Sequence, residues 1–321
     1  MKKPNLKKSF PAIMIVFLAV AISLLACEND SNDAGTATTT IKVTDAPFDD
    51  ASVTGAFVTI TDIKLDGQSV QGFTKTTVDI KAYQNGATKT LGTFNLQGKT
   101  YSTITFVLDF DKDASGNAPG CYVVTTGSVK HKLQSATNSI LINKSITLQG
   151  NATNSIIADF DLRKMIIYQS GGSSDHYDFA TATELNNSIR VAVENKTGTI
   201  SGTLTDNVSG SAKVIAYAYK KGTFNRTTEM QAQGDSGIEF KNAVNSCLVS
   251  GTGFYQLHFL ENADYEIHFA SYKDTNGDGK FELKGTLIVT AAGGLNLLNL
   301  ILNANATLTV NASATGVLLF P

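Results

Sequence analysis

The chain has 321 residues, with 26 Lys and Arg against 28 Asp and Glu, and a formal net charge of −2. The first 26 residues contain four lysines and no acidic residue, so the rest of the chain carries a net charge of −6. This acidic balance argues against nucleic acid as a partner and against a basic face that docks on anionic lipid.

The composition predicts an all-β protein. Thr, Ser, Asn and Gly are abundant, only 17% of the residues are charged, and helix-like runs of Ala, Glu, Lys and Leu are nearly absent. Many short strands separated by turn residues are therefore expected. A length of about 295 residues beyond residue 26 fits two tandem β-sandwich domains, Ig-like or transthyretin-like, each large enough for its own core.

The N-terminus has the layout of a secretory signal peptide. Four lysines occur in the first eight residues, and residues 12–26 are mostly apolar. This apolar run is shorter than the roughly 20 residues that a helix needs to cross ~30 Å of hydrocarbon. We therefore expect residues 1–26 to be removed by cleavage.

The apolar run ends in Leu-Leu-Ala-Cys at Cys27, which resembles a bacterial lipobox. The resemblance implies cleavage before Cys27 by signal peptidase II, a diacylglycerol on its thiol, and an acyl chain such as palmitate on its new amino group. Several acyl chains, each contributing ~0.8 kcal/mol per buried methylene, would make the membrane anchor effectively permanent. The alternative is an ordinary secretory signal that contains a cysteine.

Residues 27–37 are predicted to be an acidic, flexible tether, because they are polar and offer nothing to bury. Asn29, the second residue after Cys27, is not the aspartate that retains lipoproteins in the inner membrane of enteric bacteria, so the outer membrane is expected. The acidic cluster also resembles the export tags of some surface lipoproteins of Gram-negative bacteria. This would place the protein on the cell surface, and a merely solvated tether is the alternative.

Three strands are expected in the first half of the folded chain. A short strand at Ile41 ends in a turn at Asp45–Pro47, because proline cannot continue it. Residues 56–65 change their apolar face near Thr61 and Asp62, which predicts a bulge there. Residues 101–110 alternate strictly between apolar and polar side chains, so one face of this strand should be core.

Several stretches of this half together resemble the DUF4382 domain of bacterial lipoproteins, over roughly residues 38–194. They are Val43–Pro47, Val58–Leu65, Leu91–Leu108, Asp159–Arg163 and Tyr177–Val193. The resemblance implies a β-sandwich-like domain of unknown biochemical role on a secreted lipoprotein, and it supplies no catalytic residues.

A polar linker at Glu194–Thr197 is expected to separate this domain from a second one at residues 197–321. Residues 198–206 resemble the first strand of the carboxypeptidase regulatory-like, or transthyretin-like, sandwich. Residues 213–220 are expected to form a strand. The sequence departs from that family after Ala291, where residues 295–302 and 306–310 are interpreted as two extra strands.

Two alternating stretches, residues 255–259 and 265–269, predict a hairpin over a turn at Asn262–Asp264. His258 and His268 alternate with the apolar side chains of these stretches and are therefore expected to face solvent. Cys121 and Cys247 fall in different expected domains. A disulfide between them would join the two domains, whereas two separate buried thiols are the more common arrangement.

The sharpest local motif is a loop with EF-hand-like spacing. Its oxygen donors for Ca²⁺ would be Asp274, Asn276, Asp278, the Lys280 carbonyl and Glu282. Calcium takes six to eight oxygens, and Gly279 at the sixth loop position allows the sharp turn that directs them inward. Gly285 replaces the usual bidentate glutamate at position 12, so water would complete the shell. The alternative is a glycine-rich hairpin loop with solvated acids.

Other candidate chemistry is weaker. Asp109, Asp111 and Asp113 also alternate, but no glycine occupies the required position, and a polar loop at a strand end is the simpler interpretation. Metalloprotease, nucleophile-elbow, P-loop and paired zinc spacings do not occur in the sequence. We therefore do not expect an enzyme.

The sequence predicts a lipid-anchored protein of the cell envelope that acts as a binding, adhesion or structural module, stabilised by calcium. Its partners would be the membrane, through Cys27, and an envelope protein or a glycan. The alternatives are a glycan-binding surface protein, with an exposed aromatic platform at Tyr168 or Tyr177, and an accessory envelope enzyme.

Overall fold

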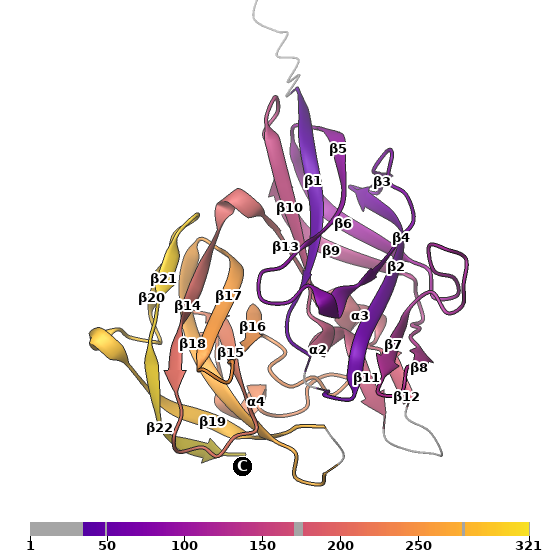
Figure 1. Cartoon of the computed structure of the whole chain (residues 1–321). Coiled ribbons are helices and arrows are strands. Elements are labelled where there is room, and N and C mark those ends of the chain that lie inside the picture. Colours follow the sequence, from indigo (N-terminus) through magenta and orange to yellow (C-terminus); the bar gives the residue numbers. More distant parts are fainter. Residues whose placement is uncertain (1–34, 49, 170–175, 278–279, 321) are drawn as a thin grey trace, which may run out of the picture.

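The computed structural model describes residues 35–48, 50–169, 176–277 and 280–320, and nearly all of its regular structure is β-strand. Figure 1 shows two lobes side by side, the first built from the N-terminal half of the chain and the second from the C-terminal half. In the described part of the chain, no helix has the length and apolar character needed to cross a membrane. Cys27 lies outside the described residues.

The first lobe is a sandwich of two sheets. One sheet consists, in spatial order, of β13 (Ile189–Val193), β10 (Thr153–Phe160), β1 (Thr36–Asp45) and β5 (Lys89–Gln97). The other consists of β8 (Val129–Lys132), β7 (Tyr122–Thr125), β2 (Val53–Leu65), β6 (Thr100–Leu108) and β9 (Ser139–Thr147), with β3 (Gln68–Ser69) and β4 (Thr76–Asp79) paired to β2. Strands β1 and β10 are parallel, and the other pairs of this lobe are antiparallel.

Several short elements connect the strands of this lobe. They are η1 (Ile80–Ala82), α2 (Leu162–Met165), the antiparallel pair β11 (Ile166–Gln169) and β12 (His176–Phe179), and α3 (Ala182–Leu185). Helices α2 and α3 lie beside the second lobe in Figure 1.

The alternation of apolar residues places the core of the first lobe as expected. In β6, Ile104, Phe106 and Leu108 are buried, while the intervening residues are less buried. In β2, the pairing with β6 shifts register between Ile60 and Asp62, which confirms the predicted bulge. The bulge lets the strand bury its apolar residues on both sides of the irregularity.

The second lobe is one curled sheet whose halves face each other. Its order is β16 (Asn245–Leu248), β15 (Lys213–Lys220), β18 (Ala263–Lys273), β19 (Glu282–Ala291), β22 (Ala312–Leu319), β14 (Thr197–Thr205) and β17 (Phe254–Glu261), with β20 (Leu300–Leu302) on β18 and β21 (Thr307–Thr309) on β14. The remaining elements are η2 (Glu194–Lys196), α4 (Arg226–Glu229) and η3 (Ala292–Gly294). The fold is therefore all-β, with two sandwiches in tandem.

The expected hairpin of residues 255–259 and 265–269 is wrong. Strand β17 pairs with β14, whereas β18 pairs with β15, β19 and β20. The apolar faces of β17 and β18 meet across the core instead, and the rings of Tyr255 and Phe269 contact edge to face at 5.2 Å. Phe259, with a φ of 54°, lies within β17 at the bulge where its pairing with β14 shifts register between Gly198 and Ile200.

The C-terminal part differs from the expectation in its strand bounds. Only residues 300–302 of the predicted strand at 295–302 form β20, and β21 is confined to residues 307–309. Leu295 and Leu298 are exposed in a turn, in which the Leu298 N–H donates to the Asn296 side chain at 3.0 Å. An apolar run of this length was therefore not sufficient evidence for a strand.

Each lobe has its own core. One core lies within residues 37–193, and another within residues 200–314, with η2 between them. A third cluster covers the outer face of β15 and β18, where the segment of residues 221–244 folds over it. Cys121 and Cys247 are both free and buried, in different cores, so the disulfide is not formed.

Candidate functional site

The charged residues of the Asp159–Lys164 segment lie where the two lobes meet, at what we call the junction. This segment runs from the end of β10 into α2, and Asp159, Asp161, Arg163 and Lys164 are all at least nine-tenths buried. Buried charges are costly unless they are paired. The partners of these side chains therefore decide what the junction does.

Asp159 links both lobes. Its Oδ2 atom accepts hydrogen bonds from Arg190 Nη2 at 2.6 Å and from Asn245 Nδ2 of the second lobe at 2.9 Å. Arg190 also donates to the backbone carbonyls of His258 and Phe259 in β17. One ion pair of the first lobe thus binds backbone and side-chain atoms of the second.

Helix α2 binds the segment that covers the third cluster. Arg163 donates to the carbonyl oxygens of Glu239 and Phe240, and the Lys164 ammonium donates to the carbonyl of Ala243 at 2.7 Å. Asp161 lies 3.3 Å from both cations. Burial lowers the pKa of Lys164, and the charge of Asp161 opposes this shift.

Glu184 of α3 holds the same segment from the other side. It accepts hydrogen bonds from Thr181, from the backbone and hydroxyl of Ser236, and from Lys241 at 3.3 Å. Burial raises the pKa of Glu184, but the hydrogen bonds from Ser236 and Thr181 outweigh it and lower the pKa to about 2. Gly234 fits here because a Cβ atom would lie 2.1 Å from the carboxylate.

Asp45, the last residue of β1, adds a third buried carboxyl group beside Asp159 and Asp161. Burial raises its pKa well above the ordinary value of 3.8, the charges of the two other aspartates raise it further, and a hydrogen bond from Gln84 opposes the shift. The buried surroundings of Asp45 therefore disfavour the charged form of its carboxyl group.

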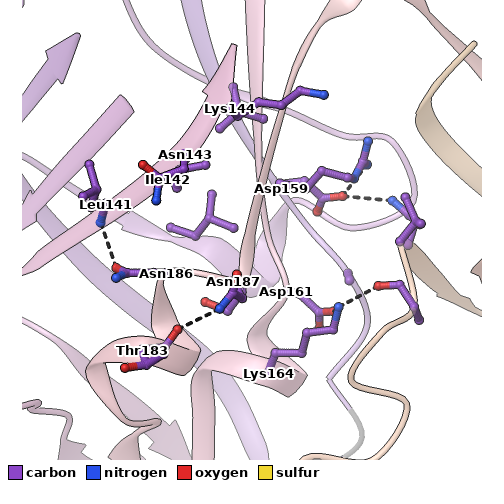
Figure 2. Close-up of a pocket in the computed structure, with 18 residues that line it drawn as sticks. Leu141, Ile142, Asn143, Lys144, Asp159, Asp161, Lys164, Thr183, Asn186 and Asn187 are labelled. Carbon is purple, nitrogen blue, oxygen red and sulfur yellow. Dashed lines mark hydrogen bonds and ion pairs between the residues drawn. The ribbon is translucent and has the colours of Figure 1, made fainter. Parts of the chain in front are cut away.

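A cavity of about 460 Å³ opens at the junction (Figure 2). Asp159, Asp161 and Lys164 line its inner part, and Leu141–Lys144 of β9, the end of α3 and Ala243–Asn245 of the second lobe line the rest. In Figure 2 the labelled side chains of Asn186, Asn187 and Thr183 lie along one side of it. Both lobes therefore contribute to its wall.

The expected calcium loop is described in part. Asp278 lies outside the described residues, while Asp274, Asn276, Lys280 and Glu282 lie within them. Asp274 Oδ1 accepts the Gly277 N–H at 2.6 Å, and Glu282 Oε2 accepts the Thr275 N–H and hydroxyl, both at 2.8 Å. In the portion of the chain that is described, no group of three or more His, Cys, Asp or Glu residues could hold a metal ion.

The two histidines expected in solvent are largely covered, so that prediction is wrong. His258 lies against Gly86 of the first lobe, where a Cβ atom would come within 2.6 Å of its ring. His268 stacks on Phe224 with ring centroids 3.7 Å apart, and it faces Glu266 at 3.4 Å. The outer faces of β17 and β18 are covered by the other lobe and by the 221–244 segment, which alternation alone does not reveal.

The proposed tyrosine platform is not exposed. Tyr177 is buried, and its hydroxyl donates to Asp50 at 2.7 Å, while Lys280 lies over the ring of Tyr168 at 3.2 Å. Asp109 accepts the backbone N–H groups of the following loop and pairs with Lys75 at 2.8 Å. This is the structural role expected of a polar loop at a strand end.

Sequence reasoning identified the Asp159–Arg163 stretch but gave it no role. The available signal was that two acids and two bases interrupt an otherwise apolar stretch, in which Phe160 and Leu162 are fully buried. Charges at such positions require partners from elsewhere in the chain. The partners Asn245, Glu239 and Ala243 are more than seventy residues away and carry no matching motif.

Residues 36–180 match the family described as Domain of unknown function (DUF4382), which confirms the resemblance for this stretch. The match ends before α3 and β13. No curated protein matches the chain. The carboxypeptidase regulatory-like assignment of residues 197–321 stays a prediction.

Three solved structures illustrate what the chain is similar to. The Bacillus anthracis TIE protein is 11% identical with a TM-score of 0.19, covering 88% of this chain and 34% of that one. A leucine-rich repeat protein from Bacteroides thetaiotaomicron is 9% identical, with a TM-score of 0.22 and coverage of 87% and 26%. The minor pilin of Streptococcus agalactiae is 11% identical, with a TM-score of 0.21 and coverage of 88% and 98%. Similarity this low carries no functional argument.

Proposed function

Since residues 36–180 are a DUF4382 domain, we propose that the protein is a lipid-anchored, non-catalytic module of the cell envelope whose two β-sandwiches act as one rigid body. The observation that carries this proposal is the burial of charged DUF4382 residues against the second lobe. Asp159, Arg163 and Lys164 all find partners there. A site built for catalysis would instead present such groups to a substrate.

The junction is suited to fix the angle between the lobes. Removing one partner of a buried ion pair costs about 3–5 kcal/mol, because the other charge is left without compensation. Rotation of one lobe would break the contacts of Asp159, Lys164 and Glu184 at the same time. A short connection of three residues, η2, further limits the freedom between the lobes.

The anchor would hold this rigid body close to the membrane. Eight residues, 28–35, separate Cys27 from the start of β1 at Thr36. Fully extended, they span at most about 30 Å, since a residue adds ~3.3–3.6 Å. The DUF4382 domain would therefore be the lobe nearest the lipid. The anchor would lie in the outer membrane, and the folded lobes would be exposed on the cell surface.

The loop from Asp274 to Glu282 is proposed to bind Ca²⁺ and to stiffen the second lobe. The hydrogen bonds from Gly277 to Asp274 and from Thr275 to Glu282 curl the loop and bring its two ends together. Four side-chain donors are fewer than calcium needs, so water would complete the shell and affinity would be modest, with a Kd of ~10⁻⁴ to 10⁻³ M.

Fractionation of cells that express the full chain tests the proposed placement. The protein should float with outer-membrane vesicles in a density gradient, and protease added to whole cells should degrade it. The control is a periplasmic protein, which should survive the same treatment. Recovery in the inner membrane, or protection from protease in intact cells, would contradict the placement on the surface.

A further inference from the structure

The cavity at the junction has the size and position of a ligand site. At about 460 Å³ it falls within the range of small-molecule pockets. It lies between two lobes, where such pockets are common, and its inner walls are contributed by residues that the junction already holds in place.

The charges around the cavity are already compensated. Asp159 pairs with Arg190 at 2.6 Å, Asp161 lies 3.3 Å from Lys164, and Lys144 pairs with Glu261 of the second lobe at 2.7 Å. A charged ligand would have to displace one of these partners. The charge balance therefore favours a neutral ligand.

The side chains along the wall offer both donors and acceptors. Asn186 uses its Oδ1 for the Leu141 N–H, which leaves its amide N–H groups, and Asn187 uses its Nδ2 for the Thr183 carbonyl, which leaves its Oδ1. Asn143 belongs to the β6–β9 ladder through its backbone, whereas its side chain is exposed at the mouth and makes no hydrogen bond with the described residues. A hydroxyl group both donates and accepts, so it matches such a mixed wall.

The apolar part of the wall adjoins these amides. Leu141, which is 39% exposed and bonded through its N–H to Asn186, and the partly buried Val244 line the cavity and offer a surface on which the C–H face of a ring can lie. We infer that the cavity binds a neutral, hydroxyl-rich ring compound of the size of a mono- or disaccharide.

Saturation-transfer NMR on the full chain, in a detergent without sugar headgroups, tests this inference. The probes are the methyl glycosides of glucose, galactose, mannose and N-acetylglucosamine. At least one should receive saturation, with a measurable Kd. If none does, or if phosphate or ethylammonium displaces the bound glycoside, the inference is wrong, because the cavity would then bind no sugar or would select charge.

Two variants of one residue locate the binding. Asn143→Ala should weaken binding about fivefold, the effect of one hydrogen bond, and Asn143→Trp should abolish it by filling the mouth. Asn95→Ala, an exposed asparagine on β5, is the matched control and should bind as the wild type. Equal binding by Asn143→Trp and the wild type would overturn the inference. The melting temperatures of junction variants test the rigid body separately. A failure to bind sugar would therefore not count against the proposed rigid body.

Discussion

Replacement of Asp159 by alanine is the sharpest test of the junction. The side chain of Asp159 is only 6% exposed, and it compensates Arg190, whose side chain is 18% exposed. Without the carboxylate, the partners of the guanidinium among the described residues are the carbonyls of His258 and Phe259 in β17, and Asn245 loses an acceptor. Breaking a buried pair from one side costs about 3–5 kcal/mol, and the partial exposure of Arg190 places the expected loss near ~3 kcal/mol.

A loss of about 3 kcal/mol corresponds to a fall in Tm of roughly 6–12 °C, since 1 kcal/mol shifts Tm by ~2–4 °C in chains of 150–250 residues. Thermal unfolding followed by circular dichroism measures this shift. The matched control is Asp111→Ala, because Asp111 also pairs with a cation, Lys132, at 2.7 Å but is 79% exposed. That variant should lose less than about 1 kcal/mol.

A second change separates charge from packing. Arg190→Met in the Asp159→Ala background removes the uncompensated cation and should recover part of the lost stability. If Asp159→Ala melts within the range of the Asp111→Ala control, the junction charges do not stabilise the contact between the lobes, and the reasoning is refuted.

Three further outcomes are expected. Cys27→Ser should move the protein out of the membrane fraction and abolish labelling with palmitate, and a labelled, membrane-bound variant would contradict the lipobox. Calcium at ten times its Kd should stabilise the wild type by about 1.4 kcal/mol, a shift of a few degrees in Tm, and the double variant Asp274→Ala with Asp278→Ala should show no shift. Because the folded-state pKa of Glu184 is lowered from 4.5 to about 2, its contribution to the free energy of unfolding is present above pH 4.5 and is lost as the pH falls toward about 2. The stability difference between the wild type and Glu184→Gln, from urea titrations at several pH values, should therefore shrink over that range, and a constant difference would contradict it.

Local patterns in the sequence predicted the strands well. The bulge near Asp62 followed from a change of apolar face, and the buried side of β6 followed from strict alternation. Strand β15, expected at residues 213–220, has these bounds in the structure. These features depend on neighbours within a few residues, which a sequence displays directly.

Features set by distant parts of the chain were missed. The residues next to His258 and His268 in the sequence do not reveal that the first lobe covers one strand and the 221–244 segment covers the other. The pairing of β17 with β14 instead of β18 is likewise a long-range choice. To predict the junction, both the Asp159–Arg163 stretch and its partners in the second lobe have to be identified. Only the Asp159–Arg163 stretch could be recognised in the sequence.

The most direct test of the account is a distance measurement between the lobes. Spin labels on cysteines introduced at Asn95 and Ser313, both exposed, can be measured by pulsed electron paramagnetic resonance, because Cys121 and Cys247 are buried and should not react. A rigid junction predicts one narrow distance distribution in the wild-type background and a broader one when Asp159→Ala and Glu184→Gln are added. A broad distribution in the wild-type background would contradict the proposal that the two sandwiches act as one body.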